Sequence, residues 1–218
     1  MPVLKYIHDY THIIWDFNGT VLNDVRLGID CVNIMLEMRG LPIIPNEEAY
    51  RRVFGFPIDD YYRRLGFDFD REDYDTVLAP EWVAHYMAGE DRCLMNPGVA
   101  ETIATIRERQ IPQVMLSATK QEQLQRQLRR LGLIDVFEEV LGLDNIHARS
   151  KTSLAVAWKR RHPDARPLVV GDTEHDADVA DAIGADCLLF LGGHQAEEIL
   201  RERQWPLIAS IPELLTFL

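Results

Sequence analysis

The sequence is short of cysteine, of positive charge and of long apolar runs. Cys31, Cys93 and Cys187 are scattered, show no paired metal-binding spacing and are odd in number, which favours reduced thiols over a disulfide framework. No run of about eighteen apolar residues is present, so a membrane-spanning helix is excluded. Charged residues such as Lys5 and Asp9 stand where a secretory signal has its apolar core. We therefore expect a soluble, cytoplasmic protein.

The charge balance limits the partners. The chain has 23 Lys and Arg against 35 Asp and Glu, and its formal charge of -12 argues against a broad nucleic-acid interface or an anionic membrane surface. A small anionic substrate remains compatible, because a bound Mg²⁺ and a lysine can override the global field locally. The 218 residues, 47% of them hydrophobic, suffice for one large domain or for one domain with a smaller insertion.

A buried strand that ends in a carboxylate is the centre of the chain. Ile13, Ile14 and Trp15 predict this strand, and Asp16 follows where the chain enters a turn that contains Gly19. In open α/β sheets the reactive crevice lies outside the carboxyl ends of the strands. Asp16 can therefore serve as a metal ligand or as a nucleophile that forms an acyl-phosphate, although a carboxylate there can also simply begin a turn.

Strands and helices alternate regularly from residue 96 onward. The pattern predicts strands at 113–116, 140–141, 168–170, 187–191 and 207–208, with helices between them and a capping box at Ser210 that starts a C-terminal helix. Such alternation indicates an α/β fold with a doubly wound parallel sheet.

The segment from 21 to 92 has a different pattern, without a clear strand. Helical spacing is predicted over 24–38, 46–53, 58–65 and 72–87, with Asn46 as an N-cap. Because this segment follows the first strand directly, we expect it to lie above the carboxyl edge of the sheet as a lid.

Polar residues follow three of the predicted strands. Asp16, Ser117 and Asp172 stand at these strand ends, Asp176 lies one helical turn beyond Asp172, and Lys151 begins a helix. Phosphoryl transfer from a small molecule needs a carboxylate nucleophile, a hard cation such as Mg²⁺ held by carboxylates, and a hydroxyl and a lysine for the phosphate oxygens.

These residues resemble the four motifs of the haloacid dehalogenase (HAD) superfamily, in the right order over nearly the whole chain. The motifs are Asp-Phe-Asn-Gly-Thr-Val-Leu at 16–22, Ser117, Lys151 and Gly-Asp-Thr-Glu-His-Asp at 171–176. The last motif and Gly-Gly-His-Gln at 192–195 are similar to the phosphoglycolate phosphatase-like branch. The resemblance implies a Rossmannoid, HAD-like core formed by residues 1–21 and 92–218, and an inserted all-helical cap formed by residues 22–91.

The resemblance also implies a role for each motif residue. Asp16 would attack phosphorus and become an aspartyl-phosphate. Mg²⁺ would be held by Asp16, the backbone carbonyl of Asn18 and Asp172, with Asp176 as a further carboxylate that binds directly or through water. The transferring phosphoryl group would be bound by Gly19, Ser117, Ala118 and Lys151.

Asn18 departs from the family pattern, which usually has at this position an Asp that protonates the leaving group and activates water. An amide does not titrate, so general acid–base assistance of about 10²–10⁴-fold would be missing. The backbone carbonyl, and with it metal binding, should be unaffected. Three explanations are open. A natural Asn can work with a leaving group that needs little protonation, or with another acid nearby; the chain can be a slow or degenerate phosphatase; or an Asp was replaced to trap a complex.

Other residues have both a functional and a structural interpretation. Lys120 is a second candidate for the phosphate, or a solvated or substrate-side residue. His175 can cap or orient the motif carboxylates or act in catalysis, and His194 can line the pocket or close a loop. Arg51 and Arg52 can meet a substrate carboxylate or form a solvated helix surface. The turn at 54–57 can face the site.

The function predicted is a Mg²⁺-dependent phosphatase that acts on a small phosphorylated metabolite through Asp16, with a cap that excludes water. Dehalogenation needs no metal, so the paired carboxylates Asp172 and Asp176 count against it. Phosphonate cleavage would need a Schiff-base lysine from the cap, and residues 21–92 contain no lysine. A sugar-phosphate mutase would need the acid–base group that Asn18 replaces. The alternative is a catalytically weak HAD protein that binds a phospho-ligand. The substrate is open, as is the choice between a monomer and a homodimer.

Overall fold

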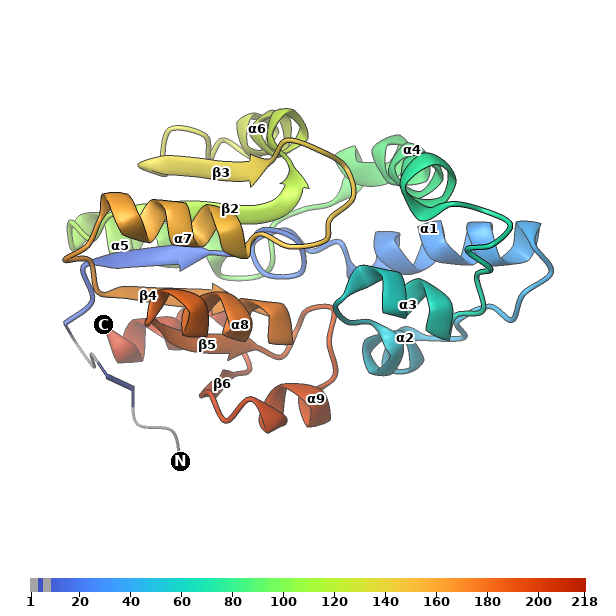
Figure 1. Ribbon diagram of the computed structural model, residues 1–218. Coiled ribbons are helices and arrows are strands. Elements are labelled where there is room, and N and C mark those ends of the chain that lie inside the picture. The colour runs from blue at the N-terminus through green and yellow to red at the C-terminus, as the bar shows by residue number, and fades with distance from the viewer. Residues whose placement is uncertain (1–3, 6–8) are drawn as a thin grey trace.

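A six-stranded parallel sheet forms the centre of the computed structural model, which describes residues 4–5 and 9–218 (Figure 1). Its strands run in the order β3-β2-β1-β4-β5-β6, and every neighbouring pair is parallel. The strands are β1 (His12–Trp15), β2 (Gln113–Lys120), β3 (Glu139–Leu143), β4 (Pro167–Gly171), β5 (Asp186–Phe190) and β6 (Leu207–Ile208). The predicted doubly wound α/β sheet is therefore confirmed.

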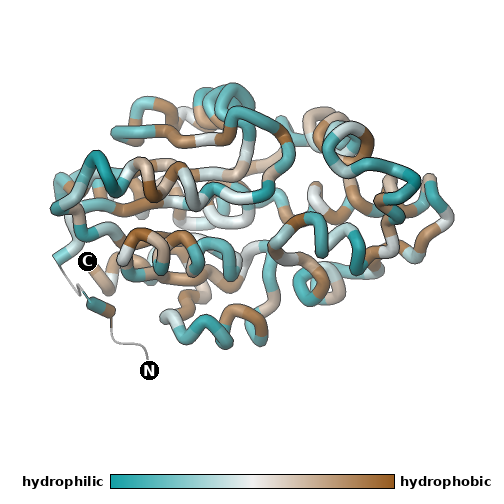
Figure 2. The backbone as a smooth tube through the Cα atoms, viewed as in Figure 1, coloured by the Kyte–Doolittle hydropathy of each residue, from teal (hydrophilic) through white to brown (hydrophobic). Residues whose placement is uncertain are grey.

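Helices cover both faces of the sheet. One face packs on α5 (Val99–Glu108), α6 (Gln121–Arg130) and the C-terminal 3₁₀ helix Ile211–Phe217, and the other on α7 (Thr152–Arg161), α8 (Glu174–Ile183) and α9 (Glu197–Glu202). Because successive side chains of a strand alternate, Ile13 and Trp15 join the first core cluster and Ile14 the second. Figure 2 shows this division, with hydrophobic strands between helices such as α6 that are hydrophilic outside.

Residues 25–92, all of them described, form helices and loops without a strand. They comprise α1 (Val25–Met38), α2 (Glu47–Val53), α3 (Ile58–Arg64), a π-helical turn Tyr74–Leu78, α4 (Ala79–Gly89) and a 3₁₀ turn Glu90–Arg92. This helical segment has a hydrophobic cluster of its own, built around Val32, Leu36, Tyr62 and Leu78. It lies on the side toward which the strand arrows point, so it covers the carboxyl edge of the sheet (Figure 1).

Most predicted boundaries are confirmed within two residues, including the Asn46 cap, whose side chain accepts a hydrogen bond from the Ala49 N–H. The helix predicted over 72–87 is wrong at its start. Asp73 instead caps a π-helical turn, and α4 begins at Ala79, because Pro80 has no N–H to continue an ordinary ladder. β2 also extends past Ser117 to Lys120 through a register shift. No helix in the described ranges is long and apolar enough to cross a bilayer.

One guanidinium ties the helical segment together. Arg39, just after α1, binds Glu72 with Nε and Nη2 at 2.6 and 2.7 Å. Its Nη1 and Nη2 also donate to Glu81 on α4, at 3.0 and 2.6 Å. Only 15% of the Arg39 side chain is exposed, so these bonds are largely shielded from water.

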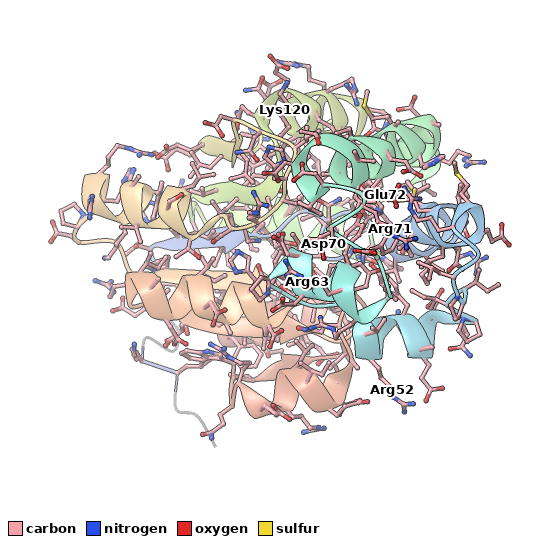
Figure 3. All side chains as sticks on the ribbon, turned by 45° about the vertical axis from the view of Figure 1, so that its right-hand side comes forward. Arg52, Arg63, Asp70, Arg71, Glu72 and Lys120 are labelled. Carbon is pink, nitrogen blue, oxygen red and sulfur yellow. The ribbon has the colours of Figure 1, made fainter. Side chains whose placement is uncertain are left out.

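We expect Arg39→Leu to lower the free energy of unfolding by about 2–3 kcal/mol, because two carboxylates lose charge-assisted hydrogen bonds. Arg71→Leu is the matched control, since Arg71 pairs with Asp68 at 3.2 Å but is 84% exposed, and should cost less than about 1 kcal/mol (Figure 3). Urea denaturation of the two variants measures both values. Equal losses would contradict the role of the shielded pair.

Candidate active site

Two neighbouring strands bring the first carboxylates together. Trp15 of β1 is in register with Val170 of β4, and the Asp16 N–H donates to the Val170 carbonyl at 2.8 Å. Asp16 and Asp172 therefore follow the ends of two adjacent strands and lie side by side. Asp176, in the first turn of α8, joins them, and one carboxylate oxygen of each lies within 4.8 Å of the other two.

Lys151 lies between two of these carboxylates. It is the N-cap residue of α7, is buried, and its Nζ contacts Asp16 Oδ1, Asp176 Oδ1 at 2.7 Å and the Leu116 carbonyl at 3.3 Å. Burial alone would lower the pKa of the ammonium, but Asp16 and Asp176 outweigh it and raise the pKa of Lys151 above its usual value. The side chain is therefore a fixed cation beside Asp16.

The carboxylates differ in their pKa. Burial raises the pKa of Asp16 well above its usual range, although Lys151 opposes the shift. Burial likewise raises the pKa of Asp172 to about 6. For Asp176 burial acts in the same direction, but Lys151 outweighs it and the pKa is lowered. Three acidic groups around one ammonium leave an excess of buried negative charge, and hard oxygen donors of this kind suit a divalent cation such as Mg²⁺.

Asp176 also holds the loop that precedes α8. Its Oδ2 accepts the Asp172 N–H at 3.1 Å and both the N–H and the hydroxyl of Thr173, at 3.0 and 2.8 Å. Gly171 leaves room for this arrangement, since a Cβ there would lie 2.0 Å from Asp176 Cγ. The carboxylate thus orients Asp172 through the backbone and Lys151 through Oδ1.

The turn after Asp16 packs against Asp172. The Thr20 hydroxyl donates to Asp172 Oδ1 at 2.8 Å, and the His194 N–H donates to Oδ2 at 2.6 Å. Gly19 has φ of 74°, and a Cβ at this position would lie 2.3 Å from Asp172 Oδ2. Both the left-handed backbone and the close approach therefore require glycine here.

Ser117, Ala118 and Lys120 line the same cavity as Asp16 and Lys151. Ser117 is buried, and its Oγ accepts the Thr119 N–H at 3.0 Å, which leaves the hydroxyl hydrogen for another acceptor. Lys120 instead pairs with Glu122 at 3.0 Å, away from the acidic group (Figure 3). The structure thus gathers every predicted site residue at one edge, with Lys120 at the margin.

Asn18 is held by contacts on both ends of its amide. Nδ2 donates to Asp24 Oδ2 at 2.7 Å and to the Tyr86 hydroxyl at 2.9 Å, and Oδ1 accepts the Thr119 hydroxyl at 2.7 Å. The Tyr86 hydroxyl in turn donates to Asp24 at 2.6 Å. An aspartate at position 18 would face the Asp24 carboxylate across one of these bonds, so the neighbourhood suits the amide.

Asp24 and His194 form a buried pair beside Asn18. Asp24 Oδ1 accepts the Gly19 N–H at 2.8 Å and lies 3.1 Å from His194 Nε2, while His194 Nδ1 lies 2.9 Å from the Tyr50 hydroxyl. Burial opposes both charges, yet His194 lowers the pKa of Asp24, and Asp24 raises that of His194. Sequence patterns missed Asp24, which precedes α1 and looked like an ordinary helix start, although its side chain makes no capping bond.

The remaining candidates act around the site. His175 Nε2 accepts the Lys151 N–H at 3.2 Å, and burial, followed by Lys151, lowers the pKa of this imidazole, so it remains a neutral acceptor. Arg51 donates to the Gly193 carbonyl at 2.8 Å. Arg52 pairs with Glu198 at 3.0 Å on the outside. Both arginines therefore join α2 to the core, not to the cavity.

The cavity between the sheet edge and the helical segment has a volume of about 150 Å³. Its core wall carries Asp16, Asn18, Ser117 and Lys151, and the opposite wall is formed by side chains of residues 50–86. Phe56 of the turn at 54–57 stacks on His175 at 4.6 Å, so this turn does face the site.

We expect Asn18→Asp to lose stability as the pH rises. The two facing carboxylates would share a proton, so the folded-state pKa of one is raised above its unfolded value of about 3.9. The folded form then binds more protons above that value, and a shift of one to two units removes about 1–2 kcal/mol by pH 8 relative to pH 4.

Asn145→Asp is the control for this substitution. Its amide also donates to a neighbouring carboxylate at 2.7 Å, that of Asp144, but this contact is exposed to water. Urea denaturation at pH 4–8 should show the loss in Asn18→Asp alone. The same pH dependence in both variants would contradict a shielded pair.

Comparisons with known proteins extend over nearly the whole chain. The tyrosine-protein kinase PtkA of Mycobacterium tuberculosis is 23% identical over 209 residues, which cover 93% of this chain and 70% of that protein. A phosphoglycolate phosphatase of Pseudomonas putida is 23% identical over 190 residues, covering 84% and 70%. The solved haloacid dehalogenase-like family protein SP0104 of Streptococcus pneumoniae superposes with a TM-score of 0.80 at 19% identity, covering 95% and 98%.

The family description of haloacid dehalogenase-like hydrolases matches residues 13–190, from β1 through the helical segment to β5. The resemblance seen in the four motifs is therefore confirmed. The chain belongs to the haloacid dehalogenase-like hydrolases.

Proposed function

We propose that this hydrolase is a Mg²⁺-dependent phosphatase that cleaves a small phosphate monoester through an aspartyl-phosphate on Asp16. The family and the phosphatases among the relatives bear out the enzyme class, a phosphoric monoester hydrolase. One observation carries the mechanism. Asp16 lines the cavity between the sheet edge and the helical segment, and the buried Lys151 contacts its carboxylate.

In the first step a carboxylate oxygen of Asp16 attacks phosphorus. The bond from phosphorus to the ester oxygen breaks, the electron pair leaves on that oxygen as an alkoxide or phenolate, and this anion takes a proton from water. Lys151 opposes the burial-driven rise in the pKa of Asp16 and so favours the ionised nucleophile. The Ser117 hydroxyl is available to the phosphoryl oxygens. The Lys151 ammonium would reach them by exchanging its long bond to the Leu116 carbonyl, at 3.3 Å, for a charge-assisted one.

The donor set fits a divalent cation. Asp16, the carbonyl of Asn18 and Asp172 would hold Mg²⁺, and Asp176 would act through water, since its own oxygens already bind Lys151 and the loop. When bound, the ion offsets the negative charge of the carboxylates and of the phosphoryl oxygens.

The second step returns Asp16 to its carboxylate. Water attacks phosphorus, inorganic phosphate leaves, and the surplus proton goes to phosphate or solvent. Asn18 does not accept that proton, and both ends of its amide are already hydrogen-bonded. Breakdown of the aspartyl-phosphate is therefore expected to be slower than its formation.

Asn18 also supports the second candidate function, a protein that binds a phospho-ligand and has lost turnover. In this alternative Ser117, Lys151 and Asp172 still form the binding site, but Asp16 is not phosphorylated. Transfer to Asp16 followed by slow release is favoured, because Asp16 lines the cavity beside Ser117 and Lys151, where a bound phosphoryl group would meet it.

Residues 22–91 are proposed as the cap, and residues 1–21 and 92–218 as the core. The separate hydrophobic cluster of the helical segment supports this division. Two sets of contacts close the cap. Arg51 and Tyr50 bind the 192–194 loop, and Arg149 of the core binds Asp75 at 2.9 Å and Asp59 at 3.4 Å.

A cytoplasmic location and a monomeric or homodimeric state remain predictions. The phosphoglycolate phosphatase-like activity predicted from the motifs rests on sequence resemblance alone, and the uncharged cap wall of the cavity favours a different ester. Cys31, Cys93 and Cys187 are all free and buried, in keeping with the expected reduced thiols.

We expect 4-nitrophenyl phosphate with Mg²⁺ to release a burst of about one nitrophenol per protein, followed by a slower steady rate. Asp16→Asn should abolish the burst and lower the steady rate by about 10³-fold or more. Asp178→Asn is the control, since Asp178 lies on α8 but pairs with Arg203 at the surface. Rapid-mixing absorbance measures both phases. Unchanged rates in Asp16→Asn would exclude the mechanism, and tight phosphate binding without any turnover would favour the binder.

Mg²⁺ should raise the unfolding temperature of the wild type, because a ligand of the folded state at 100 times its Kd adds about 2.7 kcal/mol. Asp172→Asn is expected to lose most of this rise, and Asp178→Asn to keep it. Thermal unfolding with Mg²⁺, and again after chelation, makes the comparison without relying on activity. The same rise in both variants would show that the ion binds elsewhere.

A further inference from the structure

We propose that the substrate is an aryl phosphate monoester, whose leaving group is an uncharged aromatic alcohol. The inference rests on the proposed phosphatase function and specifies its substrate class. Two features of the site carry it: the composition of the cap wall of the cavity, and the environment of Asn18.

The cap wall is aromatic. None of the side chains that residues 50–86 contribute to the cavity lining carries a charge. Eight of them are aromatic, among them Phe54, Phe56, Tyr61, Tyr62, Trp82 and Tyr86. These rings pack on one another and hold their places. Trp82 stacks on Tyr86 at 4.8 Å, and Phe54 meets Tyr61 edge-on at 5.1 Å. Such a wall favours a flat apolar group that adds offset or edge contacts.

The arginine side chains of the cap do not line the cavity. Residues 22–91 contain seven arginines and no lysine, and none of these arginines lines the cavity. Arg39 and Arg51 are held by Glu81 and by the Gly193 carbonyl, and Arg52 projects from α2 away from the protein (Figure 3). Burying a substrate carboxylate against rings without a counter-charge is costly. A phosphorylated hydroxy acid therefore fits this wall poorly.

Two tyrosines give the wall a polar but uncharged component. The hydroxyls of Tyr61 and Tyr62 make no hydrogen bond to a described residue, although both side chains line the cavity. Burial raises the pKa of both phenols, so they stay neutral. They can bind a hydroxyl or carbonyl substituent on the substrate ring, but they do not balance a charge.

The environment of Asn18 points to the same leaving group. No proton donor replaces the missing acid at this position, because the amide is committed to Asp24 and Tyr86. His194 is close, but both of its ring nitrogens are engaged, with Asp24 and Tyr50. A phenol with a pKa of about 10 leaves as its anion far more readily than an aliphatic alcohol, which ionises about as reluctantly as water at about 15.7.

The chemistry balances without an acid. Asp16 forms a bond to phosphorus, the bond from phosphorus to the aryl oxygen breaks, and the electron pair leaves on a phenolate. The phenolate takes up a proton from water after release. The cavity therefore supplies ring recognition, and the substrate itself supplies the good leaving group.

Three esters separate these two contributions: phenyl phosphate, benzyl phosphate and phosphoglycolate, each assayed with Mg²⁺ for phosphate release. Phenyl and benzyl phosphate carry the same ring, but only phenyl phosphate releases a phenol. We expect a kcat/KM at least about 100-fold higher for phenyl phosphate, because kcat/KM reports the formation of the aspartyl-phosphate, the step in which the leaving group departs. Phosphoglycolate should have a kcat/KM at least about 100-fold lower than phenyl phosphate.

Trp82→Ala tests the ring wall, with Phe69→Ala as the control. Phe69 is a cap ring that stacks on Tyr74 at 5.9 Å but does not line the cavity. Trp82→Ala should lower the ratio of kcat/KM for phenyl phosphate over phosphoglycolate by about 10-fold, and Phe69→Ala should leave it unchanged. Because this ratio is taken on one preparation, a partly unfolded variant still gives a valid value.

The outcomes are distinct. Preference for phosphoglycolate over phenyl phosphate, or equal kcat/KM for phenyl and benzyl phosphate, would overturn the aryl assignment while leaving the phosphatase intact. If no ester releases phosphate, including 4-nitrophenyl phosphate, the proposed function fails and the assignment with it.

Discussion

A buried ammonium between two carboxylates is the interaction on which the site depends. Lys151 comes from the start of α7, Asp16 from the end of β1 and Asp176 from α8, so three elements must be in register before the contacts form. Parallel pairing of β1 with β4 places Asp16, and the packing of α7 and α8 on one face of the sheet places Lys151 and Asp176. Removal of Lys151 or of one of the two carboxylates would leave an uncompensated buried charge, so the three side chains depend on one another.

The cavity exists only because the cap is tied to the same edge. Tyr50 reaches His194, whose backbone N–H also orients Asp172, so one loop connects the cap wall to the acidic group. On the other side Arg149 bridges to Asp59 and Asp75. These ties are partly exposed ion pairs and single hydrogen bonds, which are individually weak and therefore compatible with a cap that opens for substrate.

Most of the fold follows from local patterns in the sequence. Apolar runs predicted β1 and β4, and helical spacing predicted α1 and α6, because periodicity reports which face is buried. The start of α4 was missed, since the effect of Pro80 on the preceding turn depends on backbone bonding that periodicity does not describe. The motif residues were found because their chemistry is specific. The pair of Asp24 and His194 was not, because their contact spans 170 positions and arises only when two loops meet.

The amide at position 18 and the aromatic wall are two consequences of one electrostatic condition. Asp16, Asp24, Asp172 and Asp176 already line or adjoin the same buried space, against the buried charges of Lys151 and His194. Lys120 lies at the margin of the cavity and is paired with Glu122. A further carboxylate, whether on residue 18 or on the substrate, would enter a region of low dielectric that already has excess negative charge. Ser117 and Lys151, the buried donors of the core wall beside Asp16, are those assigned to the phosphoryl group. The remainder of the ligand must then be neutral, and the rings of the cap are suited to a neutral group that binds through its surface rather than its charge.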